Sequence, residues 1–140
     1  MGLRRKSREL ALQFLYGHDF QDRSGDEQAV TDELEEFVAS FDTVEKTLPY
    51  ARQIVVGLCA HLPEIDALLT THAKNWRLER MTVVDRNVLR IAAYEMLYCD
   101  DVPTQVAINE ALEIAKRYST SDAVSFINGI LDALQASSTD

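Results

Sequence analysis

Glycine and proline are scarce in this sequence, with 5 and 3 among its 140 residues. Because both residues mark turns between short strands, their scarcity favours long helices. No apolar run approaches the roughly 18 residues that span a bilayer. The basic N-terminus is not followed by the apolar core and cleavage site of a secretory signal. These absences predict a helical protein of the cytoplasm.

Metal-binding patterns are also missing. The two cysteines, Cys59 and Cys99, lie far apart in helix-like surroundings, which predicts buried free thiols. The three histidines, His18, His61 and His72, share no ligand spacing with each other or with the cysteines. We therefore predict neither a metal site nor a bound cofactor.

Catalytic motifs are equally absent. The sequence contains no glycine-rich phosphate loop, no G-x-S-x-G elbow and no H-E-x-x-H helix. Glu110 and Glu113 would share one face of a helix, but a solvated ion pair explains such carboxylates better than acid–base catalysis. The sequence therefore does not predict an enzyme.

Positive charge is in deficit, with a formal net charge of −9. Its distribution is uneven, because four of the first eight residues are basic: Arg4, Arg5, Lys6 and Arg8. Residues 19–45, by contrast, carry ten carboxylates and a single arginine. The net charge argues against nucleic acid, whereas the basic N-terminus offers a local surface for phosphates.

Apolar residues, 46% of the chain, recur at helical spacing almost throughout. In the first half, helices are predicted over residues 3–20, 27–41, 49–62 and 63–72. In the second half, one helix begins at Thr82 and ends at the break at residues 100–103, and two more are predicted over residues 104–118 and about 122–134. Residues 73–81, with Trp76 among them, connect two halves. We thus predict one all-α domain over residues 1–140, with about seven helices in two halves at residues 1–72 and 82–136.

Two local features of these helices carry further expectations. Thr82 can cap the helix that follows it, and Asp85 lies where a carboxylate favours the helix dipole. Gly129 lies inside the last helix, where glycine costs about 1 kcal/mol relative to alanine. We expect its lack of a side chain to permit close helix packing.

A helical wheel of residues 3–20 places Leu3, Leu10 and Phe14 on the buried side. Arg8, Leu12 and Tyr16 then follow one another at i, i+4 and i+8 on the side facing solvent. An exposed ring in line with guanidinium groups suits single-stranded RNA, whose unstacked bases lie beside phosphates. The alternative is a solvated basic helix start with Tyr16 half-buried. Charge and periodicity leave both interpretations open.

Four ordered motifs make the sequence similar to the NusB family over nearly its whole length. They are R-R-K-S-R-E-L-A-L-Q-F-L-Y at residues 4–16, V-D-R-N-V-L-R-I-A-A-Y-E at 84–95, V-P at 102–103 followed by V-A-I-N-E-A at 106–111, and F-I-N-G-I-L-D at 126–132. The resemblance implies two packed helical halves that bind boxA, a short single-stranded RNA element. It also implies a partner, the small-subunit ribosomal protein NusE, and action on elongating RNA polymerase in ribosomal RNA operons.

The resemblance also implies site residues. Those expected to bind RNA are Arg4, Arg5, Lys6, Arg8, Tyr16, Asp122 and Phe126. Asp85 matches an acidic position linked to partner binding. Each of the last three has a structural alternative, because Phe126 can be a core aromatic and the two aspartates can simply favour helix starts.

The sequence departs from the family pattern where positive charge is concerned. Ser125 stands where the family can have lysine, and no basic tail follows Leu134. These departures predict weaker binding to RNA alone and more dependence on NusE. Two other functions remain open: the RNA-positioning domain of a ribosomal RNA cytosine methyltransferase, and a protein-interaction module that uses the acidic residues 19–45.

Overall fold

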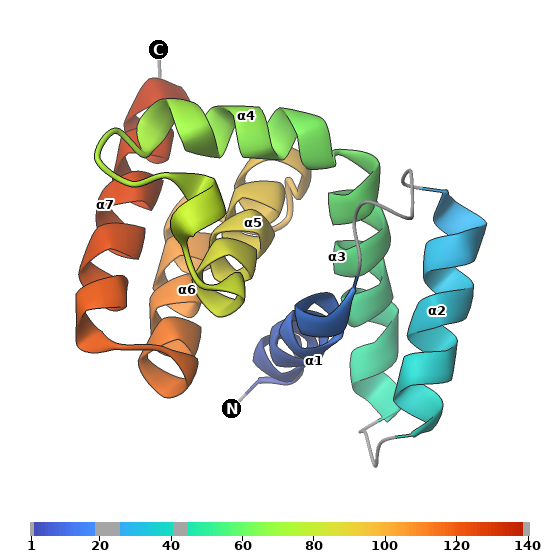
Figure 1. Cartoon of the computed structure of the whole chain (residues 1–140). Helices are drawn as coiled ribbons and strands as arrows, with labels where there is room; N and C mark the ends of the chain where they lie inside the picture. Colours follow the sequence, from blue (N-terminus) through green and yellow to red (C-terminus); the bar gives the residue numbers. More distant parts are fainter. Residues whose placement is uncertain (1, 19–25, 41–44, 139–140) are drawn as a thin grey trace. The chain divides into compact units, whose positions relative to one another are not determined.

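The computed structural model describes residues 2–18, 26–40 and 45–138. All regular structure in these residues is helical, so the predicted all-α class is confirmed (Figure 1). The helices are α1 (Leu3–Gly17), α2 (Glu27–Ala39), α3 (Leu48–Ala60), α4 (Leu62–His72), α5 (Val83–Tyr98), α6 (Thr104–Tyr118) and α7 (Ser121–Ser138), with short 3₁₀ helices η1 (Glu45–Thr47) and η2 (Leu78–Arg80). The predicted helix ends at Phe20 and Phe41 lie outside the described residues.

Local signals set where most helices begin. The Thr82 side chain accepts a hydrogen bond from the backbone N–H of Asp85 at 3.1 Å, which confirms the predicted cap of α5. Thr120 caps α7 in the same way, through the N–H of Ala123 at 3.1 Å. Pro49 lies in the first turn of α3, where its missing N–H costs nothing. Helix α1 lacks such a signal, because it begins after Gly2, which has no side chain to act as a cap.

The chain divides into two compact units, residues 1–62 and 63–140. In the first unit, α1 and α2 both pack against α3. The ring of Phe14 on α1 meets that of Phe37 on α2 edge-on at 5.5 Å. The remaining core of this unit consists of aliphatic side chains that are fully buried, including Val30, Leu34, Ile54, Val55 and Leu58.

In the second unit, α5, α6 and α7 pack pairwise around fully buried leucine and isoleucine side chains. Helix α4 is joined to them by polar contacts. Arg90 on α5 forms a two-pronged ion pair with Asp66 on α4, with both nitrogen–oxygen distances at 2.9 Å. The expected division placed residues 63–72 with the first half, whereas the structure groups them with the second unit.

Three chemical features complete the description. Cys59 and Cys99 are buried thiols outside any disulfide in the described residues, as predicted. Over the same residues, no three His, Cys, Asp or Glu side chains are grouped so that they could hold a metal ion. No single described helix is long and apolar enough to cross a membrane, although one bent pair, residues 45–60 with 62–72, passes by length and composition alone.

The prediction for Gly129 is wrong. Gly129 is exposed on α7, and a Cβ built there would meet no described atom within 4 Å apart from its chain neighbours and the nearby backbone of its own helix. Close helix packing therefore does not explain this glycine.

Gly129→Ala is expected to raise the free energy of unfolding by about 0.5–1 kcal/mol, because alanine has the higher helix propensity. Thermal unfolding followed by circular dichroism measures the change. Gly17→Ala is the matched control, since Gly17 is equally open but lies in the last turn of α1 and should gain less. A lower melting temperature for Gly129→Ala would contradict the open surroundings of this residue.

Candidate nucleic-acid interface

The start of α1 concentrates positive charge on the first unit. Arg4, Arg5 and Lys6 follow directly after the first residue of α1, and the first turn of this helix contains no acidic residue. Arg4 and Lys6 are exposed and Arg5 is partly exposed. The guanidinium carbon of Arg4 lies over the ring of Tyr50 on α3, 4.4 Å from the ring centre. This distance is within the range of a cation–π contact.

The prediction that Arg8 and Leu12 of α1 face solvent is wrong. Residues 7–12 are all buried, and Arg8 and Leu12 are each only 4% exposed. Leu3, which the wheel placed on the buried side, is exposed. A wheel with one buried side fails because the polar side chains in the middle of α1 are buried together with its apolar ones. The Arg8 guanidinium carbon lies 5.7 Å from the Tyr50 ring centre.

Tyr16 is 64% exposed, as predicted, but its surroundings differ from the prediction. It lines a shallow groove of about 490 Å³ together with Glu33 and Glu36 of α2. Tyr16 lies twelve positions after Arg4, which corresponds to about 18 Å along a helix axis. Tyr16 therefore shares its groove with carboxylates, whereas the predicted neighbour Arg8 is buried.

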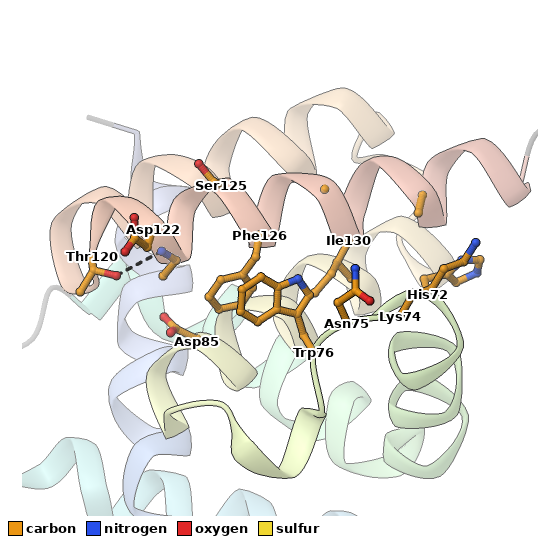
Figure 2. Close-up of a pocket in the computed structure, with 13 residues that line it drawn as sticks. His72, Lys74, Asn75, Trp76, Asp85, Thr120, Asp122, Ser125, Phe126 and Ile130 are labelled. Atoms are coloured by element: carbon orange, nitrogen blue, oxygen red, sulfur yellow. Dashed lines mark hydrogen bonds between the residues drawn. The ribbon is translucent and has the colours of Figure 1, made fainter.

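The second unit carries an open groove of about 820 Å³. Trp76, in the segment between α4 and η2, stacks on Phe126 of α7 with ring centres 4.7 Å apart and planes inclined by 23°. Figure 2 shows the two rings side by side near the middle of the groove, with His72, Lys74 and Asn75 towards one end and Asp85 and Asp122 towards the other. Trp76 remains 49% exposed, so the stack presents aromatic surface to solvent.

The two predicted aspartates line the same groove but differ in exposure. Asp122 is exposed in the first turn of α7, where its charge also favours the helix dipole. Asp85 is only 5% exposed, and its Oδ1 accepts a hydrogen bond from Ser119 Oγ at 2.5 Å. That bond connects the start of α5 to the end of α6, so Asp85 supports the wall of the groove.

The structure thus brings the predicted residues together in two separate sets. Asp85, Asp122 and Phe126 line one groove of the second unit. Arg4 and Arg8 both approach one ring in the first unit. Sequence reasoning missed the two ring partners, Tyr50 and Trp76. The signal for Trp76 was present, since the only tryptophan of the chain lies in a polar connection where no core position explains it.

Comparison with known proteins identifies the family of this chain. The model described as "NusB family" matches residues 5–136. A relative in Desulfosudis oleivorans named "Transcription antitermination protein NusB" is 47% identical over 135 residues, which cover 96% of this chain and 86% of the relative. A relative of the same name in Trichlorobacter lovleyi is 44% identical over 140 residues, covering 100% of this chain and 95% of the relative.

Solved structures share the fold. NusB of T. maritima matches with a TM-score of 0.76 and 41% identity, covering 94% of this chain and 89% of that chain. A structure of the antitermination factors NusB and NusE in complex with dsRNA matches with a TM-score of 0.80, covering 96% of this chain and 97% of that chain. Its identity is 23%, so it supports the fold alone. With a family match that extends from residue 5 to residue 136, this chain belongs to the NusB family.

Proposed function

We propose that this protein is a transcription antitermination factor that binds boxA-type single-stranded RNA together with NusE in the cytoplasm. The complex would act on elongating RNA polymerase, notably in ribosomal RNA operons. The names of its relatives support antitermination and argue against an enzyme. A protein of the same fold forms a complex with NusE and dsRNA, so RNA and NusE are the partners that we propose for this chain.

The single observation that carries RNA binding is the exposed stack of Trp76 on Phe126. A half-exposed tryptophan leaves apolar surface in water, which is unfavourable unless a ligand covers it. Unpaired bases stack on such rings, and each stacked base contributes about 1–3 kcal/mol. Lys74 can contact a phosphate beside the rings, while Asp122 can accept hydrogen bonds from base amino groups.

The start of α1 supplies the electrostatic part of the proposal. Arg4, Arg5 and Lys6 would bind phosphates, because they combine positive charge with exposure. Arg8 belongs to the same proposed set, although its burial makes a supporting role more consistent with the structure than an open contact. Tyr16 remains a proposed RNA contact, and Asp85 a proposed residue of the partner site.

The double substitution Arg4→Ala, Arg5→Ala is expected to weaken binding of a boxA-type RNA on the order of ten-fold. Gel-shift titration with and without NusE measures the affinity. Repeating it across salt concentrations should show a salt slope that is smaller by about 1.4, since each phosphate contact to a single strand contributes about 0.7. The control Arg80→Gln, Lys116→Gln removes two exposed positive charges elsewhere and should bind like the parent.

Two outcomes would contradict the proposal. Parent protein that shifts no RNA, alone or with NusE, would leave only the protein-interaction function open. Equal losses in the α1 variant and the control would mean that net charge, and not this surface, attracts the RNA.

A further inference from the structure

One aromatic ring lies close to two guanidinium groups in the first unit. Tyr50 is half-buried near the start of α3. The Arg4 guanidinium carbon lies over its ring at 4.4 Å from the centre, and that of Arg8 lies at 5.7 Å. Both distances fall within the roughly 6 Å over which a ring face attracts a cation.

Several local features at the start of α1 oppose helix formation. Gly2 offers no capping side chain, and positive charges in a first turn oppose the helix dipole. Arg4 and Arg8 are also like charges at i and i+4, a spacing that destabilises a helix. The electron-rich face of Tyr50 attracts both cations and so offsets part of these local costs.

We propose that Tyr50 is a positioning residue for RNA binding, which holds the guanidinium of the exposed residue Arg4 in a fixed place. This inference rests on the proposed function. A guanidinium can stack its flat face on an aromatic ring, which leaves its N–H donors pointing outward in the plane of the group. Those donors can therefore serve a phosphate while the ring contact persists. A guanidinium that is already fixed also loses less side-chain entropy when RNA binds.

Fluorescence anisotropy with a labelled boxA-type single-stranded RNA, in the presence of NusE, tests the proposal. Tyr50→Leu is expected to weaken binding about two- to five-fold, which corresponds to one exposed cation–π contact. Tyr50→Phe keeps the ring face and should bind like the parent. Tyr98→Leu is the matched control, because Tyr98 is another partly exposed tyrosine, at the far end of α5, and its loss should leave RNA affinity unchanged.

A double-substitution cycle separates positioning from a merely structural role. If Tyr50 acts through Arg4, then Tyr50→Leu should cost no further affinity once Arg4→Ala is present. Losses that simply add would overturn the proposal, and so would a Tyr50→Phe variant as weak as Tyr50→Leu.

A measurement on the unchanged protein keeps the proposal testable if Tyr50→Leu fails to fold. The NMR order parameter of the Arg4 Nε–H group should exceed that of Arg80, an exposed arginine in η2. Equal mobility of the two groups would overturn the positioning role. Parent protein that binds no RNA would instead overturn the proposed function, so the two failures are distinguishable.

Discussion

Replacing Arg90 with alanine is expected to lower the free energy of unfolding by about 2–4 kcal/mol, one of the largest effects that a single substitution should have in this chain. The Arg90 side chain is 10% exposed, and its Nε and Nη2 donate to the two oxygens of Asp66 at 2.9 Å each. Its Nη1 donates to Asn87 at 3.0 Å. Loss of the guanidinium would leave a partly buried carboxylate on α4 without these donors.

Thermal unfolding followed by circular dichroism measures this loss, and a decrease in melting temperature of about 8–15 °C is expected. Lys116→Ala is the matched control, because Lys116 and Glu113 form an ion pair at 2.8 Å with side chains that are 61% and 45% exposed. Exposed pairs of this kind contribute less than about 1 kcal/mol. A melting temperature for Arg90→Ala within the range of the control would show that the ion pair does not stabilise the second unit.

The Arg90–Asp66 pair also shows which features the sequence could not predict. Helix α6 was predicted at its observed bounds, Thr104–Tyr118, because the breaks on both sides are local. Thr82 was predicted as a cap for the same reason, since its accepting hydroxyl and the donating N–H of Asp85 lie three residues apart. The partner of Arg90 lies 24 positions away on another helix. Neither hydrophobic periodicity nor helix propensity predicts a contact between such distant residues.

In the candidate site, too, local features could be predicted from the sequence, whereas contacts between distant residues could not. Charge at the start of α1 was visible in the order of residues, as was the exposure of Tyr16. The burial of Arg8 was not visible, because a wheel assumes that polar side chains face water, whereas α1 buries polar and apolar side chains alike over residues 7–12. Phe126 was predicted from resemblance alone. Its stacking on Trp76 joins positions 50 residues apart, a contact that no local sequence pattern predicts.

Trp76→Ala is expected to weaken RNA binding by about 1–3 kcal/mol, roughly 5- to 160-fold, because one stacking surface is lost. The salt slope should not change, since the substitution removes no charge. A lower affinity with an unchanged salt slope distinguishes loss of the groove from loss of the basic start of α1. The Arg4→Ala, Arg5→Ala variant should instead lower both the affinity and the salt slope. Tyr98→Ala is the matched control, because it removes one ring from another partly exposed stack, Tyr94 with Tyr98, whose centres are 5.7 Å apart.

Trp76 also supplies its own reporter, because it is the only tryptophan in the chain. A base that stacks on the indole should quench or shift its fluorescence in proportion to the RNA bound. Phe126→Ala should alter the emission before any RNA is added, since it removes the ring 4.7 Å away. If the emission of the parent stays constant while a gel shift shows that RNA has saturated the protein, the bases do not contact this stack. RNA binding would then depend on the cations of α1.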